Sequence, residues 1–310
     1  MLEFKRNHDL KGYSVKFPLN FYNTLKFVKH QEIEPIDTFS ILNKKKKTVH
    51  GIIHFTAVGQ NAFSLPKSPF GGYEFDSLVD DQIFHDFCLY VQNELKSSKF
   101  KKIKIIEAPD VYVDELNFDT LEVLKELGYE TSISDINHFV NLDDVDGISL
   151  LSTMERRHFR KALAKNYRWK LESADALPEV YSFIERCREQ QKLKVNISFE
   201  DLQRSFKAFP GKYRILSIRH NGYLTATSIT VEVNKNIIYN YLPASDKKFK
   251  QDSPMVFLLV NLYKYAKSMN YQILDLGLSS VKGKIQTGLA EFKERMGASI
   301  CEKRILEKVL

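Results

Sequence analysis

The chain has 310 residues, of which 43% are hydrophobic, 12% aromatic and 27% charged. This composition excludes a disordered or low-complexity polypeptide, and a chain of this length can bury a core large enough to fold without a metal or disulfides. The formal net charge of +7 favours an anionic partner only where positive charge is concentrated, so the charge by itself assigns no function.

The cysteines and the apolar segments indicate a cytoplasmic protein. Cys88, Cys187 and Cys301 lie far apart, without the spacing of a metal site or a CxxC motif, which favours a reducing compartment. The first residues, MLEFKRNHDLKGYSVKF, lack the apolar core of a signal peptide. The longest apolar run, near 255–260, is too short to cross a bilayer. We therefore expect a soluble cytoplasmic protein with no membrane span.

In the N-terminal half, the residue pattern predicts alternating strands and helices. The expected elements are a strand at 49–58, a loop containing KSPFGG, a helix at about 79–97, a strand within 101–109, and a helix with its exit at 119–130. The first of these helices is predicted from apolar residues at helical spacing, namely Ile83, Phe87, Val91 and Leu95.

The C-terminal half repeats that order after a three-stranded meander. Ser198 and Asp201 form a capping-box pattern that opens a helix, and Asn221-Gly222 predicts a tight hairpin turn. The elements that follow Ser198 are a helix ending near Pro210, strands at 213–219, 223–233 and 237–243, a helix from Pro254, a strand at 273–277, a helix at about 284–296 and a strand at 299–306.

The two halves therefore look like two copies of one α/β unit. Each contains strand, helix and strand with short connections, which predicts a parallel strand pair joined by a right-handed crossover. Gly128 and Gly297 end matching helices, where a left-handed residue is least costly. We place the junction near 142–150, with a first domain at 1–145 and a second at 146–310.

The segment YLPASDKKFKQDSPM has the character of a phosphate site. Lys247, Lys248 and Lys250 precede a helix whose start is marked by Asp252 or Ser253 as a cap and by Pro254 at the first helical position. The N–H groups and the dipole of such a helix favour an anion. The alternative is a solvated basic loop before an ordinary capped helix.

A second basic segment, MERRHFRKALAKNYRWK, predicts a helix from about Ser152. Arg157, Lys161 and Lys165 share one face, and Arg160 belongs to a neighbouring pair. Like charges at this spacing destabilise a helix slightly, so a phosphate-bearing ligand is one candidate for compensation. A solvated basic face is the alternative.

Polar and glycine residues mark two further candidate regions. Ser68-Pro69-Phe70-Gly71-Gly72-Tyr73 is a loop whose backbone could approach a ligand closely, or merely a turn. Asp275 lies in a buried strand, where a carboxylate is either a hydrogen-bonded anchor or a functional acid. Tyr241 lies beside the lysine segment and could line a cleft or belong to the core. The sequence contains no GxSxG, HExxH, Walker or dinucleotide motif.

These segments together resemble FemAB-like proteins of the GNAT superfamily. The resemblance is carried by RRHFRKALAKNYRWKLE, by YLPASDKKFKQDSPMVFLLVNLYKYAKSMNYQILDLGLSS, by GLAEFKERMGA and by SPFGGY. It covers most of the chain, is strongest from about 150 to 300, and is closest there to BioF2-like acetyltransferases. It implies an α/β (α+β) protein with tandem GNAT-like domains, each a mixed, mostly antiparallel sheet with flanking helices and a central parallel strand pair.

The resemblance also implies a function. Such proteins transfer an acyl or aminoacyl group from acyl-CoA or aminoacyl-tRNA to an amine, which can be a small molecule or a peptidoglycan or nucleotide-linked precursor. No metal and no DNA would be involved. The implied residues are Asp275 and Tyr241 for catalysis; Lys248, Lys250, Gln251, Asp252, Ser253 and Pro254 for the donor; and Arg157, Arg160, Lys161, Ser68, Gly71, Gly72 and Tyr73 for the substrate. The alternative is a non-catalytic module that binds a nucleotide-sugar or a protein.

Overall fold

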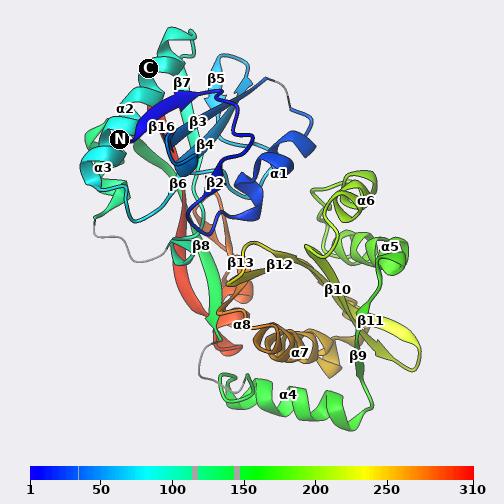
Figure 1. The fold of residues 1–310 in the computed structure, drawn as a ribbon. Coiled ribbons are helices and arrows are strands. Elements are labelled where there is room, and N and C mark those ends of the chain that lie inside the picture. The colour runs from blue at the N-terminus through cyan, green and yellow to red at the C-terminus, as the bar shows by residue number, and fades with distance from the viewer. Residues whose placement is uncertain (34, 114–117, 143–146) are drawn as a thin grey trace. The chain divides into compact units, whose positions relative to one another are not determined.

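The computed structural model describes residues 1–33, 35–113, 118–142 and 147–310, which form two compact units (Figure 1). Unit 1 comprises Met1–Ile136, Lys282–Lys284 and Cys301–Leu310, and unit 2 comprises Asn137–Val281 and Ile285–Ile300. The end of the chain therefore returns to unit 1. The central part of the expected junction, residues 143–146, lies outside the described residues.

Unit 1 is built on a mixed sheet. Two strand pairs are parallel, β5 with β7 and the short β2 with β4. The other neighbours with a described register are antiparallel. Its strands are β1 (Glu3–Arg6), β2 (Ser14–Val15), β3 (Ile36–Asn43), β4 (Thr48–Val58), β5 (Asn61–Phe63), β6 (Glu74–Phe75), β7 (Lys102–Ile106) and the end of β16 (Ser299–Val309). Its helical segments are η1 (Phe21–Asn23), α1 (Leu25–His30), α2 (Asp81–Ser97), η2 (Asp110–Tyr112) and α3 (Thr120–Glu126).

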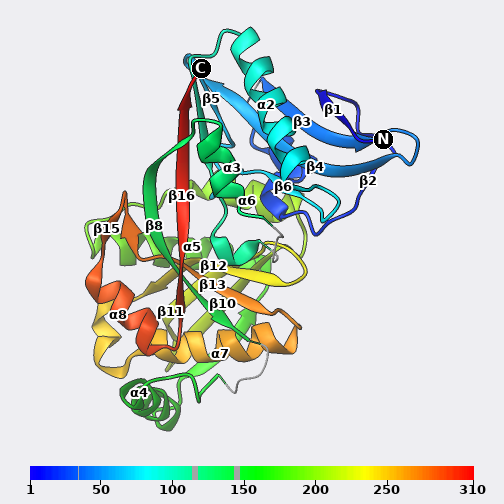
Figure 2. The same ribbon diagram turned by 90° about the vertical axis from the view of Figure 1, so that its left-hand side faces the viewer.

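Helices α2 and α3 pack against each other on one face of this sheet (Figure 2). Phe87, Val91 and Leu95 of α2 are buried in the core, and Ile83 packs against it, as the helical spacing predicts. Burying such a side chain stabilises the fold by about 1.5–3 kcal/mol. The apolar stripe of α2 therefore fixes the helix on the sheet.

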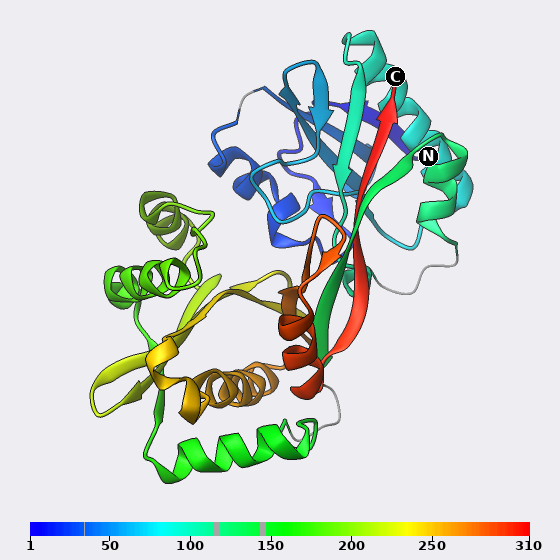
Figure 3. The same ribbon diagram turned by 180° about the vertical axis from the view of Figure 1, so that it is seen from behind.

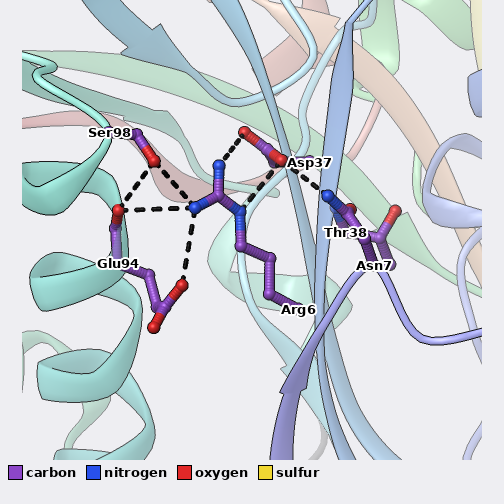
Figure 4. Close-up of polar contacts among 6 residues, drawn as sticks. All are labelled: Arg6, Asn7, Asp37, Thr38, Glu94 and Ser98. Atoms are coloured by element: carbon purple, nitrogen blue, oxygen red, sulfur yellow. Dashed lines mark hydrogen bonds and ion pairs between the residues drawn. The ribbon is translucent and has the colours of Figure 1, made fainter.

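A polar cluster fastens the edge strand of unit 1. Arg6, the last residue of β1, donates from Nε and Nη2 to the two carboxylate oxygens of Asp37 at 3.0 and 2.9 Å (Figure 4). Its Nη1 also reaches the side chains of Glu94 and Ser98, at the end of α2. Asn7 donates a further bond to Asp37 at 2.8 Å. Since charge-assisted hydrogen bonds are strong, this cluster ties strand and helix together.

Unit 2 contains a sheet in the order β8, β13, β12, β11, β10, β9, in which only β12 and β13 are parallel among the described pairs. Its strands are β8 (Glu130–Asn141, of which 137–141 belong to this unit), β9 (Arg168–Glu172), β10 (Tyr213–His220), β11 (Tyr223–Glu232), β12 (Ile237–Ser245) and β13 (Ile273–Leu278). The short strands β14 (Ser280–Val281) and β15 (Lys284–Ile285) pair with each other.

Helices cover both faces of this sheet (Figure 3). One face carries α7 (Pro254–Ser268), with α4 (Thr153–Ala164) packed against α7, and the other carries α5 (Leu177–Glu189) and α6 (Phe199–Ala208). The remaining helical segments are η3 (Ala174–Ala176), η4 (Lys247–Asp252) and α8 (Thr287–Arg295). Helix α7 is buried almost all round, because it lies between the sheet and α4.

Most elements agree with the sequence pattern, and the expected α/β class with mixed, mostly antiparallel sheets is confirmed. Asn221 and Gly222 both have positive φ, as the predicted hairpin turn requires, and Gly128 and Gly297 end their helices at φ of 81° and 86°. One local expectation is wrong. The lysine segment expected to be a loop is the 3₁₀ helix η4, whose first turn is fixed by the Asp246 side chain accepting from the N–H of Lys248.

Candidate functional site

The parallel strands β12 and β13 diverge near the middle of unit 2. Residues 237, 238 and 239 of β12 pair with residues 273, 274 and 275 of β13, respectively. Beyond these pairs β12 continues to Ser245 and β13 to Leu278 without a further described pair. A bulge between Asp275 and Gly277 accompanies the change of direction in β13. The last six residues of β12 thus have no backbone pairing with β13, and such an edge can pair with another extended, amide-bearing chain.

Helix α7 begins directly after η4, and its N-terminus is not closed by a side chain. Ser253 occupies the N-cap position in a left-handed conformation with φ of 51°, and its side chain makes no capping hydrogen bond. Pro254 stands at the first helical position, as expected. Pro254 has no N–H, and the N–H groups of Ser253 and Val256 bond to the carbonyls of Lys250 and Ser253, so the N–H of Met255 and the dipole of this 15-residue helix are what favour an anion.

Asp252 does not cap this helix, so that part of the expectation is wrong. Its carboxylate accepts from Lys165 Nζ at 2.6 Å and from the Tyr167 hydroxyl at 3.1 Å. The bond from Lys165 is the main cause that lowers the pKa of Asp252. Tyr167 is buried, so the pair anchors the end of η4 to the α4 segment and keeps the carboxylate away from the start of α7.

The basic residues of α4 divide into two groups. Lys161 Nζ donates to the carbonyl of Gln251 at 2.8 Å and lies 3.3 Å from the Asp252 carboxylate, so it holds the end of η4 against α4. Arg157 and Arg160 are exposed, and within the part of the chain that the structure describes neither has an ion pair. The side chains predicted to bind substrate thus have different surroundings.

The lysines of η4 also differ. Lys247 donates from Nζ to the Gln190 carbonyl, which ties η4 to α5. Lys248 and Lys250 are exposed, and no ion pair involves either of them among the described residues. Lys250 and Lys248 are therefore the cations of η4 that remain available to an anion near the start of α7.

Asp275 anchors a buried polar cluster where the strands separate. It is 2% exposed, and its Oδ1 accepts from Asn137 Nδ2 at 2.9 Å and from the N–H of Gly277 at 2.6 Å. Gly277 has φ of 76°, and a Cβ there would lie 3.2 Å from the Tyr239 ring. The carboxylate thus holds the bulge that turns β13 away from β12.

Lys293 of α8 is the charged residue that the sequence reasoning missed. The residue is 6% exposed, and its Nζ donates to the carbonyls of Gly277 and Leu278 at 2.7 and 2.8 Å. Burial lowers the pKa of its ammonium to about 8, while the charge of Asp275 opposes this shift. An ammonium has three N–H donors, so one remains for a developing negative charge.

His138 lies beside this ammonium and is fully buried. Neither ring nitrogen has a hydrogen-bond partner in the described structure, and its closest carboxylate contact is Glu294 at 3.8 Å. Burial, followed by the charge of Lys293, lowers its pKa. An unpartnered buried imidazole is costly unless a water or a ligand satisfies it.

The face of β12 opposite α7 is lined by tyrosines. The Tyr239 and Tyr241 rings lie 5.7 Å apart, and burial raises the pKa of Tyr241 to about 12, so both hydroxyls stay protonated at neutral pH. Arg188 of α5 donates to the Pro243 carbonyl at 3.3 Å, on the part of β12 that has left β13. Burial lowers the pKa of Arg188, and no carboxylate pairs with it among the described residues.

The remaining predicted residues lie in unit 1. Ser68 is buried, and its hydroxyl has no partner in the described structure. The N–H of Gly71 donates to the carbonyl of Ile106 at 2.9 Å. Gly72 and Tyr73 line a cavity of unit 1.

The fold has known counterparts. Residues 154–294 match the family model of the acetyltransferase (GNAT) domain. FemX superposes with a TM-score of 0.73 at 13% identity, over 99% of this chain and 97% of FemX. L-PGS from Bacillus licheniformis gives 0.59 at 14% identity, over 87% of this chain and 83% of L-PGS. A tandem GNAT protein from the clavulanic acid biosynthesis pathway gives a TM-score of 0.55 at 9% identity, over 100% of this chain and 98% of that protein.

No curated protein sequence matches the chain. The family match covers residues 154–294, and the structural counterparts show that the chain shares their fold. Within the described ranges, no helix combines the length and apolar character needed to cross a membrane. No cluster of histidine, cysteine, aspartate and glutamate side chains there could hold a metal ion.

Proposed function

Because the chain has a FemAB-like GNAT fold, we propose that unit 2 transfers an acyl or aminoacyl group from acyl-CoA or aminoacyl-tRNA to an amine. The observation that carries this proposal is the uncapped N-terminus of α7, placed directly after the strand that diverges from its parallel neighbour. Both proposed donors carry phosphate groups, and a helix N-terminus with nearby lysines is suited to bind one.

The donor would be held at two places. Its phosphate would lie at Ser253, Pro254 and Met255, with Lys250 and Lys248 adding positive charge and Gln251 beside them. If the donor is acyl-CoA, its amide-bearing arm would extend along the unpaired edge of β12, where backbone groups can pair with its amides. The reactive ester or thioester carbonyl would then lie near the residues around Gly277.

The chemistry requires few protein groups. The amine nitrogen attacks the carbonyl carbon, a C–N bond forms, the C–S or C–O bond breaks, and the proton lost by nitrogen goes to the departing thiolate or alkoxide. Lys293 would stabilise the oxyanion with the N–H that its two backbone acceptors leave free. Asp275 would act as a positioning residue, because its carboxylate is already bonded to Asn137 and Gly277. Tyr241 stays a candidate for contact with the substrate.

The roles of the basic helix follow from its contacts. Arg157 and Arg160 are free to meet phosphates of the donor or the acceptor, whereas Lys161 mainly fixes η4. A small-molecule or peptidoglycan-precursor amine fits the proposal as acceptor, and tRNA enters it only as the carrier of an aminoacyl donor.

Calorimetry can test the donor. With CoA, binding should be detectable, and Lys250→Glu should weaken it about tenfold or more, since it reverses a charge beside the phosphate. Lys235→Glu, at the exposed β11–β12 turn, is the matched control and should leave binding unchanged. With aminoacyl-tRNA, binding should fall steeply with salt because phosphate contacts release counterions. Absence of binding to both donors would contradict the proposal.

A further inference from the structure

Unit 1 contains a cavity of about 340 Å³ that the proposed transfer chemistry does not use. It lies where β7 ends and α3 begins, and β6, α2 and the unit 1 part of β16 complete its wall. Gly72 packs closely against the backbone of Glu107, since a Cβ on Gly72 would lie 3.4 Å from the Cα of Glu107. The cavity is therefore a feature of the fold of unit 1 itself.

Carboxylates dominate the charge of this cavity. Glu74, Glu107, Asp110 and Asp119 line it, against the guanidinium of Arg304. Arg304 is already neutralised: Nη1 and Nη2 donate to the two carboxylate oxygens of Asp110, and Nε lies 3.3 Å from Glu302. An anionic ligand would consequently find no available cation among the described lining residues.

Three of these carboxylates have their own donors. Glu74 accepts from the backbone N–H and the side-chain amide of Asn20, at 2.8 and 3.0 Å, and from Asn23 at 2.6 Å. Asp119 caps α3, and Asp110 is bonded to Arg304.

Glu107 is the exception among the carboxylates that line the described cavity wall. Its Oε2 is buried and has no hydrogen-bond partner in the described structure. A buried oxygen of this kind is costly unless a ligand, a proton or a water satisfies it. The cavity thus contains one carboxylate oxygen that has no hydrogen-bond partner among the described residues.

The apolar part of the wall is aromatic. Phe75 and Phe118 stack with ring centroids 5.9 Å apart, and Phe84 lies 4.9 Å from Phe75 and 5.7 Å from Phe118. Phe70 and Tyr73 also line the cavity. Aromatic faces attract cations and accommodate hydrocarbon, whereas they repel anions.

We propose that this cavity binds a primary ammonium group on an apolar stem, with the Glu107 carboxylate as its counterion. The ammonium supplies both the hydrogen bond and the charge that Glu107 lacks, and the phenylalanine rings contact the stem. This site belongs to unit 1 alone, so the inference stands independently of whether unit 2 transfers an acyl group.

Proton linkage accompanies such binding. Burial, with smaller contributions from Asp110 and Asp119, raises the pKa of Glu107 to about 7 against the opposing charge of Arg304. A bound cation favours the ionised carboxylate, so binding expels the proton when the pH is below this value. The apparent affinity should rise about tenfold between pH 6 and pH 8, as the free carboxyl group becomes ionised.

Ligand-observed NMR on the full chain can test the proposal with three probes of equal length: butylammonium, 1-butanol and butyrate. Butylammonium should bind, and 1-butanol and butyrate should bind at least about tenfold more weakly. Glu107→Gln mimics the protonated side chain and should fold. It should weaken butylammonium binding about tenfold and reduce its dependence on pH, of which Glu74 keeps a part because burial also raises its pKa to about 7. Glu126→Gln, on the exposed side of α3, is the matched control and should bind like the unaltered protein.

Two results would overturn the inference. Butyrate binding as tightly as butylammonium would identify an anion or merely apolar site, with Arg304 released from Asp110. Butylammonium binding that is equal at pH 6 and pH 8 in the unaltered protein would exclude Glu107 as the counterion, and this measurement needs no variant. Failure of CoA and aminoacyl-tRNA to bind unit 2 would leave both tests unaffected.

Discussion

The two units contain the same strand–helix–strand element with opposite charge at the helix start. In unit 1, α2 connects the parallel strands β5 and β7, and the Asp80 side chain caps it by accepting from the N–H of Ile83 at 2.8 Å. In unit 2, α7 connects β12 and β13, has no side-chain cap, and follows Lys248 and Lys250. A carboxylate closes the first helix to anions, and the second helix is open to them.

The helices that follow these strand pairs, α3 in unit 1 and α8 in unit 2, end with the same backbone bonds but differ in the side chain at one equivalent position. The N–H of Tyr129 bonds to the carbonyl of Leu124 at 3.0 Å, and that of Ala298 bonds to the carbonyl of Lys293 at 3.1 Å. Because these are the same bonds of the helix-ending motif, Leu124 and Lys293 occupy equivalent positions. Leu124 lines the cavity of unit 1, and Lys293 contacts the end of β13.

This comparison indicates a division of roles on one fold. Unit 2 gathers positive charge at the start of α7 and a buried ammonium at Lys293, as an anionic donor and an oxyanion would require. Unit 1 has carboxylates in its cavity and an apolar residue at the equivalent helix position. Under the two proposals, one fold would carry two sites of opposite preference, because function depends on the side chains placed on it.

The largest expected effect comes from replacing Lys293 of unit 2 with leucine, the residue at the equivalent position of unit 1. Lys293→Leu removes the proposed oxyanion donor and should lower the rate of transfer from the bound donor by about 10²–10³-fold. Lys293→Arg keeps the charge and should retain part of the rate, which a purely structural role does not predict. Lys235→Leu should retain full activity. A single-turnover assay with the donor identified by calorimetry is the measurement.

The pH dependence of that rate sharpens the assignment. With a pKa of about 8, Lys293 is mostly charged at pH 7 and loses its proton as the pH rises through 8. The rate per bound donor should therefore fall above pH 8 if the ammonium is the active form. Lys293→Arg, whose guanidinium stays charged in this range, should not share the fall, and an identical pH profile in that variant would contradict the oxyanion role.

A smaller effect should appear in the stability of unit 1. The folded pKa of Glu107, about 7, is above its ordinary value of 4.5, so the folded state binds more protons between these values. Its contribution is complete below pH 4.5 and is lost as the pH rises through 7, by up to roughly 3 kcal/mol. The free energy of unfolding of the unaltered protein should fall relative to Glu107→Gln over this range, measured by urea denaturation. A constant difference would contradict the raised pKa.

The sequence predicts the elements well where local patterns dominate. Helix α2 follows from the spacing of Phe87, Val91 and Leu95, and Asn221-Gly222 determines its hairpin through the positive φ of both residues. Strand β9 and helix α5 are absent from the expectation, and so is the long strand β8. The residues of β9 are mostly exposed, so its sequence shows little apolar alternation.

The site is less predictable because it depends on distant partners. Asp252 satisfies every local rule for a helix cap, yet Lys165 and Tyr167, more than 80 residues away, bind its carboxylate. Lys293 resembles a solvated lysine until α8 is packed against β13. One signal was available: its distance from Gly297 equals that of the buried Leu124 from Gly128, which predicts an inward-facing side chain.

The smallest effects test the two helix starts directly. Asp80→Ala removes the cap of α2 and should destabilise the protein by about 1 kcal/mol. Ser253→Ala removes no capping bond from α7, so the change in the free energy of unfolding should stay below about 0.5 kcal/mol. Ser253→Gly should stabilise the protein by up to about 1 kcal/mol, because glycine adopts φ of 51° without the cost of a Cβ. Urea denaturation measures all three variants. Equal destabilisation by the two alanine substitutions would mean that Ser253 closes α7 as Asp80 closes α2, and unit 2 would then lack the open helix end on which anion binding depends.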